Sequence, residues 1–306
     1  MVCYKCLEEI KADESKQCGL HQNCFLQWFD LSDSQSFKDV QAKSTSTGPV
    51  KNASNGFTKN KSHFHGRYKK YVATLGNVSY VLKVKEEKFP ELPGTEYLCN
   101  QIAEHLKIEV PPFYFILFEE EVPTFVSRNF MQDCVGTLNH INSFFEKDED
   151  YNCENIINII TENTGRLSEI ERFIELCLFD ALTGNHDRHA GNIGFVQTSK
   201  ELKLSPFYDN PCYLGTEIDS LLGADHNPAG HIFTAASKEP KIKEYAEEFI
   251  RLSYGAVVAR FRDKIDLVEI NELVDKAFIS TKRKTAIKVL IAKRFKELQD
   301  VLQNGI

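Results

Sequence analysis

One segment of the chain, residues 183–210, limits the possible folds more than any other. An apolar stretch with helical periodicity ends at Gly184 and is followed by a polar run that extends to Asn192. The chain then becomes apolar twice, over residues 193–196 and 202–207, which predicts the two strands of a hairpin. A helix, a polar loop and a hairpin in this order place the polar side chains at the ends of the hairpin near one another.

Three oxygen-bearing side chains of this segment, Asp187, Asn192 and Asp209, suit phosphoryl transfer. Mg²⁺ prefers hard oxygen ligands and takes only one or two carboxylates from a protein. Asp187 stands five positions before Asn192, which is the order of catalytic base and metal ligand in the D-x-x-x-x-N loop of kinases. Asp and Asn also cap turns, but turn capping does not account for the second aspartate at hairpin distance.

The run GNHDRHAGN at 184–192, followed by SPFYD at 205–209, resembles the catalytic and metal-binding segments of the HipA-like serine/threonine kinases. That family includes the HipA and HipT toxin kinases and the CtkA-type effector kinases. The resemblance implies that Asp187 is the catalytic base, that Asn192 and Asp209 bind Mg²⁺, and that His189 supports the loop. It also implies a bilobal protein-kinase-like fold with ATP as the phosphoryl donor.

The loop departs from HipA at one position, because HipA has a lysine where this chain has Gly191. Any phosphate contact from that lysine would have to come from elsewhere, and Arg188 is the candidate. The glycine form is similar to that of the CtkA-type kinases, the phosphatidylinositol 3- and 4-kinases and actin-fragmin kinase. Phosphorylation of an inositol lipid or another small alcohol is therefore an alternative to protein phosphorylation, and a nucleotide-binding pseudokinase is a third.

A predicted hairpin upstream supplies a lysine for the nucleotide. Residues 71–75 and 78–84 alternate as strands around a Gly76-Asn77 turn, and Lys83 lies inside the second apolar run. Thirteen residues later, Glu96 opens a helix for which Thr95 is a plausible N-cap.

Kinases pair such a strand lysine with a helix glutamate and direct it to the ATP phosphates. A solvent-facing edge lysine is the other interpretation of Lys83. The resemblance favours pairing, because the stretch from Glu91 to Glu96 matches the E-L-P-x-x-E sequence of HipA-like proteins.

Two further nucleotide contacts follow from the resemblance. Residues 65–71 resemble the short phosphate loop G-x-Q-x-K of the family, which makes Gly66 and Lys69 the predicted phosphate-binding residues. Two strands are expected at 113–118 and 123–130. The end of the second one occupies the place of the adenine hinge, where backbone groups of Ser127, Arg128 and Asn129 would bind the base.

The second half of the chain is mostly helical, with stretches expected at 242–261, 267–278 and 281–302. The basic cluster Lys282-Arg283-Lys284 on the last of these reads as a solvated face. A strand-rich first part and a helix-rich second part predict an α+β fold in two lobes. The expected organisation is a knuckle, a linker, a nucleotide-binding lobe and a catalytic helical lobe, over residues 1–30, 31–62, 63–135 and 136–306.

The N-terminus carries the pattern C-x2-C…H-x2-C, formed by Cys3, Cys6, His21 and Cys24. Zn²⁺ favours four tetrahedral sulfur and nitrogen ligands, and a segment this short needs a metal to fold alone. Cys18 competes as a ligand, since it also lies three positions before His21. A structural zinc knuckle is the prediction, and an unstructured reduced tail is the alternative.

Composition excludes several classes of protein. The net charge of −7 argues against a protein that binds nucleic acid through phosphate contacts. No apolar run reaches the roughly 20 residues that span a bilayer, and no secretory signal is visible. Nine cysteines, several in apolar stretches, suit reduced thiols in the cytoplasm, with signal-free export as an effector left open. The expected partners are a protein substrate and an antitoxin.

Overall fold

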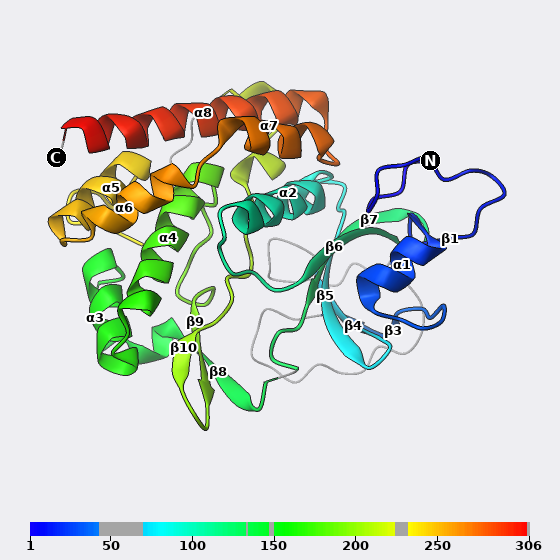
Figure 1. Ribbon diagram of the computed structural model, residues 1–306, viewed down its shortest axis with the longest axis horizontal. Coiled ribbons are helices and arrows are strands. Elements are labelled where there is room, and N and C mark those ends of the chain that lie inside the picture. The colour runs from blue at the N-terminus through cyan, green and yellow to red at the C-terminus, as the bar shows by residue number, and fades with distance from the viewer. Residues whose placement is uncertain (43–69, 133, 147–149, 224–231, 305–306) are drawn as a thin grey trace.

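The computed structural model describes residues 1–42, 70–132, 134–146, 150–223 and 232–304 (Figure 1). Both helices and strands are present, as predicted, and the α+β fold class is confirmed. The longer helices are α1 (Gln22–Phe29), α2 (Leu92–His105), α3 (Cys153–Thr164), α4 (Leu167–Thr183), α5 (Ile242–Arg251), α6 (Gly255–Asp263), α7 (Leu267–Lys276) and α8 (Thr281–Asn304). The strands are β1 (Lys16–Gln17), β2 (Leu20–His21), β3 (Lys38–Ala42), β4 (Lys70–Leu75), β5 (Val78–Val84), β6 (Phe113–Phe118), β7 (Val122–Arg128), β8 (Gly136–His140), β9 (Gly194–Thr198) and β10 (Leu202–Leu204).

The first lobe is built on one antiparallel sheet of order β3-β4-β5-β7-β6. The predicted hairpin β4–β5 turns at Gly76, whose φ of +60° is a left-handed conformation that glycine adopts without strain. Helix α2 covers one face of the sheet and the N-terminal segment with α1 covers the other (Figure 1). The strand β3 corrects the prediction of a linker over 31–62, since at least residues 38–42 pair with β4.

The helical lobe also carries a second, smaller sheet of order β10-β9-β8. Strand β8 was not expected from the sequence, and β10 ends at Leu204 instead of continuing to residue 207. The core of this lobe surrounds α4, most of whose side chains are buried. That helix delivers the polar loop at its C-terminal end, where Gly184 takes a φ of +82°.

Two helix boundaries differ from the prediction. The stretch 242–261 is not one helix, because the chain turns at Ser253, with a φ of +72°, and α6 begins at Gly255. Thr95 is not the N-cap of α2. The helix starts three residues earlier, and the Thr95 hydroxyl donates to the carbonyl of Leu92 at 2.9 Å inside the first turn.

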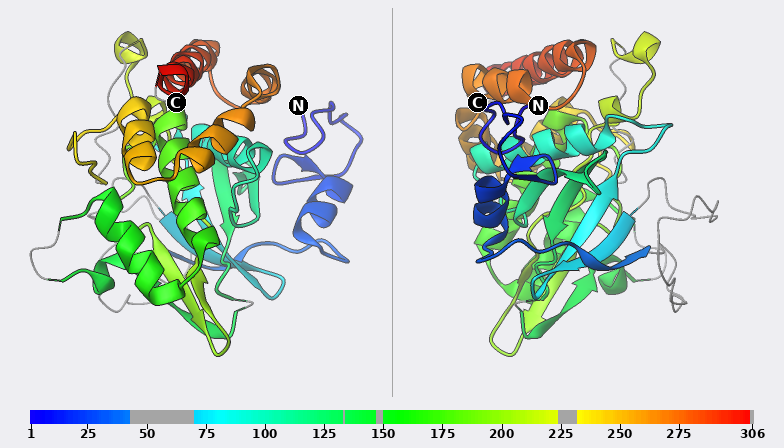
Figure 2. Two further views of the ribbon diagram at one scale, coloured as in Figure 1. Left: turned by 60° about the vertical axis from the view of Figure 1, so that its left-hand side comes forward. Right: turned by 90° about the vertical axis from the view of Figure 1, so that its right-hand side faces the viewer.

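The segment 1–30, called the knuckle below, does not stand apart from the first lobe. Figure 2 shows it on the side of the sheet away from the helical lobe. Its buried residues Leu20, Phe25 and Phe29 share one apolar cluster with the sheet. The backbone N–H of Leu117 on the edge strand β6 donates to the carbonyl of Cys18 at 2.8 Å. The knuckle thereby covers a strand edge that would otherwise be open.

All nine cysteines lie in the described part of the chain, and each is a free thiol, as the sequence suggested. Among the described helices, none is both long and apolar enough to cross a lipid bilayer.

Candidate active site

Lys83 lies at the centre of the candidate site, between the two lobes. Its side chain is only 8% exposed, and its ammonium group contacts the carboxylates of both Glu96 on α2 and Asp209 in the helical lobe. The contact to Asp209 measures 2.5 Å. Burial disfavours the ammonium form, but the two carboxylates outweigh burial and raise the pKa of Lys83. A solvent-facing edge lysine is thereby excluded.

Asp209 is held as a carboxylate by two ammonium groups. Besides Lys83, it accepts a 2.8 Å contact from Lys70 on β4. Burial alone would raise the pKa of Asp209, but Lys83 and Lys70 together hold it well below its usual range. The backbone of Asp209 has a φ of +62°, a conformation that few residues other than glycine, asparagine and aspartate adopt. Such strain is found where a fold fixes a functional side chain.

The loop of residues 184–192, called the catalytic loop below, is tied to Asp209 through Asn185. The Asn185 amide donates to the Asp209 carbonyl at 3.4 Å, and its carbonyl oxygen accepts from the Asp187 backbone at 3.0 Å. The Asn192 amide donates to the Asp187 carbonyl at 2.9 Å. The three predicted residues therefore lie on neighbouring backbone segments. A side chain at Gly184 would lie 2.8 Å from the Tyr213 ring, so glycine is needed there for close packing.

Arg188 forms all its hydrogen bonds inside the protein, which removes it as a substitute for the HipA lysine. Its guanidinium group is buried and pairs with Asp180 of α4 through two hydrogen bonds of 2.7 and 2.9 Å. It also donates to Asn210 at 2.6 Å and to the Tyr208 carbonyl at 2.7 Å. The contacts to Asn210 and Tyr208 join the catalytic loop to the segment that carries Asp209, and those to Asp180 join it to α4. Arg188 is a structural residue because its donors are used inside the protein.

His189 contacts the backbone of its own loop. Its side chain is exposed, and its Nδ1 accepts a hydrogen bond from the backbone N–H of Gly191 at 3.1 Å. That contact lies within the catalytic loop and does not join it to another element.

The predicted hinge residues are divided between the two faces of the sheet. Ser127 is the β-partner of Val81 and so shares its face with Lys83, two residues further along β5. Arg128 is the β-partner of Tyr80 and points to the opposite face. The backbone N–H of Arg128 donates to Pro112 and that of Asn129 donates to Ser79. These two N–H groups are used by the protein and do not donate to a base in this arrangement.

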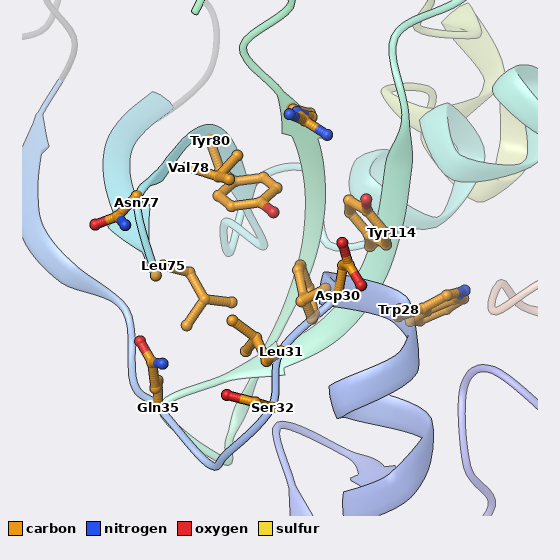
Figure 3. A pocket seen from close by; sticks show the side chains of 13 residues that line it. Trp28, Asp30, Leu31, Ser32, Gln35, Leu75, Asn77, Val78, Tyr80 and Tyr114 are labelled. Atoms are coloured by element: carbon orange, nitrogen blue, oxygen red, sulfur yellow. The ribbon is translucent and has the colours of Figure 1, made fainter. Parts of the chain in front are cut away.

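The Arg128 side chain instead lines a cavity of about 290 Å³ behind the sheet. Figure 3 shows Trp28, Tyr80 and Tyr114 around this cavity, together with Asp30 from the end of the knuckle. None of the predicted catalytic residues lines it. The cavity is a feature of the contact between the knuckle and the sheet.

Gly66 and Lys69 of the predicted phosphate loop lie outside the described residues. The neighbouring lysine, Lys70, is described and contacts Asp209. The sequence could have indicated it, because the lysine of a G-x-Q-x-K pattern that starts at Gly66 is Lys70.

A second group of ligands gathers in the knuckle. One ligand atom from each of Cys3, Cys6, His21 and Cys24 lies within 4.8 Å of all the others, a spacing that could hold one metal ion. The Nδ1 atom of His21 faces Cys6 Sγ at 3.4 Å and Cys24 Sγ at 3.9 Å. Its other ring nitrogen faces the Glu9 carbonyl at 3.3 Å. Metal-binding histidines are commonly oriented in this way.

The thiols of this group fit a cation. Burial raises the pKa of Cys3, but hydrogen bonds from the backbone N–H groups of Cys6, His21 and Lys5 outweigh burial and lower this pKa to about 7. Burial and the neighbouring thiols raise the pKa of Cys24 to about 12. The thiolates disfavour one another unless a positive ion lies between them. Cys18, the alternative ligand, is not part of this group, and burial first and Glu120 second raise its pKa to about 12.

Comparison with known proteins agrees with this geometry. A family model described as the HipA-like C-terminal domain matches residues 56–265, more than half of the chain. The chain belongs to this family. No curated protein matches it by sequence.

Two solved structures show the same fold. The Helicobacter pylori proinflammatory kinase CtkA is similar with a TM-score of 0.63 and 20% identity, over 77% of this chain and 93% of that one. A chain from the Shewanella oneidensis MR-1 toxin–antitoxin complex of HipA, HipB and operator DNA is similar with a TM-score of 0.55 and 13% identity. That match covers 79% of this chain and 65% of the other. The bilobal kinase-like fold is thereby confirmed.

Sequence reasoning missed four residues of the site: Lys70, Asp180, Asn185 and Asn210. Asp180 is a buried acid on an otherwise apolar stretch of α4, which is a signal that a buried cation lies nearby. Asn185 and Asn210 each follow a residue that the sequence singled out. Nothing in the local pattern indicates which atoms they join, because their partners come from other segments.

Proposed function

We propose that this chain transfers the γ-phosphoryl group of ATP to a protein serine or threonine hydroxyl, with Mg²⁺ as the assisting ion. The observation that carries the proposal is Lys83, which contacts Glu96 of one lobe and Asp209 of the other. Kinases use such a lysine–glutamate pair beside a metal-binding aspartate to hold the nucleotide phosphates. The family membership supports the same activity.

Asp187 is the proposed base that orients the acceptor hydroxyl. Its backbone is fixed by Asn185 and Asn192. Within the described residues its carboxylate makes no hydrogen bond and its side chain is half-buried, so the carboxylate can accept a proton from a hydroxyl placed against it.

Asn192 and Asp209 would hold Mg²⁺, which would offset the negative charge of the phosphates. Asn192 is buried at the end of the catalytic loop, and its amide nitrogen is used by the Asp187 carbonyl, so its oxygen is the atom left for a ligand. The Asp209 oxygen that is not bound to Lys83 accepts from Lys70. We expect Lys70 to exchange Asp209 for the phosphates when nucleotide enters.

The knuckle is proposed to hold a structural Zn²⁺ through Cys3, Cys6, His21 and Cys24. The convergence of four soft and borderline ligands supports zinc, and this ion would supply stability and no chemistry to the reaction. A protein substrate, an antitoxin and a cytoplasmic location are further proposals. The HipB antitoxin is part of the complex of the Shewanella protein.

The decisive experiment supplies the protein with radiolabelled Mg-ATP and a protein lysate, a panel of inositol lipids, or no acceptor. We expect label on protein. Asp187→Asn and Asp209→Ala should each lower transfer at least about a hundredfold, the scale of such groups. Asp263→Asn, at a carboxylate that is 65% exposed, is the control and should keep the rate.

Other outcomes are equally informative. Label on lipid alone would replace the protein substrate with a lipid one. Binding of Mg-ATP without transfer to any acceptor would identify a pseudokinase. Equal rates in both aspartate variants and in the wild type would refute the assignment of the site.

A further inference from the structure

Helix α2 begins at a carboxylate that the helical lobe holds firmly. Glu91, immediately before α2, accepts hydrogen bonds from the backbone N–H of Ser280 at 3.1 Å and from its hydroxyl at 3.0 Å. Arg283 on α8 faces the same carboxylate oxygen at 3.3 Å. Glu91, Ser280 and Arg283 are called the latch below. The latch joins the two lobes at the end of the helix that carries Glu96.

Arg283 is buried, which corrects for this residue the prediction that the basic cluster at the start of α8 is a solvated face, whereas Lys282 is 72% exposed. Its side chain is only 7% exposed. Its Nε donates to the Leu214 carbonyl at 2.8 Å, and one terminal nitrogen donates to the Glu217 carbonyl. Both carbonyls belong to the segment that follows Asp209. Arg283 thus connects the start of α2 with the chain that carries the other partner of Lys83.

The first turn of α2 also packs against the backbone of these segments. A side chain at Gly94 would lie 2.6 Å from the Phe278 carbonyl, and one at Gly215 would lie 2.2 Å from the Thr95 hydroxyl. Phe278 itself stacks on Phe115 with ring centroids 5.0 Å apart. The start of α2 is therefore enclosed by close contacts and has little room to shift.

Glu96 is held by its contact with Lys83 and by the placement of the first turn of α2. One carboxylate oxygen binds Lys83, and the other is buried without a hydrogen bond among the described residues. Glu96 lies five residues after Glu91, about 7.5 Å along the helix at 1.5 Å per residue. A shift or rotation of the first turn would therefore move the Glu96 carboxylate directly.

We propose that Glu91 is a positioning residue, which acts through the first turn of α2 to keep Glu96 against Lys83, with Arg283 and Ser280 as its anchors. The expected effect of Glu91 on ATP turnover rests on the proposed function. The expected effect of Glu91 on the stability of α2 does not depend on that function. The described contacts of the Glu91 carboxylate are to Ser280 and Arg283 and to none of the residues proposed to bind nucleotide or metal, so its loss should matter only while Glu96 can pair.

The test is a double-mutant comparison of ATP turnover. Glu91→Ala should lower kcat/KM for ATP about tenfold in the wild-type background, and by less than about twofold in a Glu96→Gln background, because residues that act as a unit are not additive. Glu87→Ala, at an exposed glutamate on the same connection, is the matched control and should stay within about twofold of the wild type. Equal losses in both backgrounds would overturn the proposal, because they indicate general destabilisation.

Hydrogen exchange separates this inference from the proposed function. Glu91→Ala should speed amide exchange in α2 while the sheet β8–β9–β10 keeps its wild-type rates. A wild-type protein without phosphoryl transfer would refute the proposed function, and the exchange rates would still decide whether Glu91 holds the helix. Unchanged exchange in α2 would overturn the latch whatever the activity.

Discussion

The catalytic loop and the knuckle gather polar side chains by two different means. The catalytic loop is held by a buried ion pair, Arg188 with Asp180, and by the Asn185 amide, which donates to both Asp180 and the Asp209 carbonyl. The knuckle brings four metal-ligand side chains together with few hydrogen bonds among them. A protein-only network keeps its shape without an ion, whereas a cluster of thiols needs a cation to offset mutual repulsion. The two regions should therefore respond in opposite ways to mutation and to chelation.

The largest loss of stability in either region should come from Arg188→Ala. The substitution leaves Asp180 buried and unpaired, which typically costs about 3–5 kcal/mol of stability. Denaturant unfolding would measure it. Arg166→Ala is the matched control, because its side chain and that of its partner Glu201 are 45% and 32% exposed, and such exposed pairs contribute little to stability. A loss at Arg188 no larger than at Arg166 would show that the loop is held in another way.

Removal of metal should act on the knuckle alone. A strong zinc chelator should lower the Tm by about 5 °C or more and expose residues 1–30 to protease, since metal binding is coupled to folding. Limited proteolysis with mass spectrometry would locate the cuts. Mg-ATP binding measured in the same sample should persist if the catalytic loop is independent of the ion. Metal analysis that finds no zinc in protein purified without chelator would contradict the knuckle proposal.

A smaller effect is expected from acid. Asp209 has a folded-state pKa well below the ordinary value of about 3.9. Its ionised form therefore stabilises the fold fully above that value, and this stabilisation is lost as the pH falls further. The unfolding free energy of the wild type should decrease more steeply below about pH 4 than that of Asp209→Asn. Parallel curves for the two proteins would mean that Lys70 and Lys83 do not hold Asp209.

The smallest effect should come from Cys18→Ser, which tests the choice of ligands. Cys18 stands outside the ligand group, so the variant should keep the zinc content of the wild type. Cys24→Ser removes one of the four ligands and should lower the zinc content. Equal zinc content in both variants would indicate a different ligand set.

By itself the sequence predicted many of the local elements and pointed to the residues that are proposed to form the site. Periodicity indicated the hairpin at Gly76, and spacing singled out Asp187, Asn192 and Asp209, because both signals lie within short stretches of chain. The prediction from the sequence failed where the same apolar spacing fits either one long helix or two shorter ones. The helix over 242–261 breaks at Ser253, although its apolar residues continue the helical spacing.

Only the tertiary structure decided which distant groups meet. Lys70 and Asp209 are separated by 139 positions, and the partners of Arg283 lie immediately before α2 and on the segment after Asp209. Such contacts are fixed when α2 packs between the sheet and the last two helices, as Figure 1 shows. A buried charge must find a partner, but the sequence around it does not say from which element that partner comes.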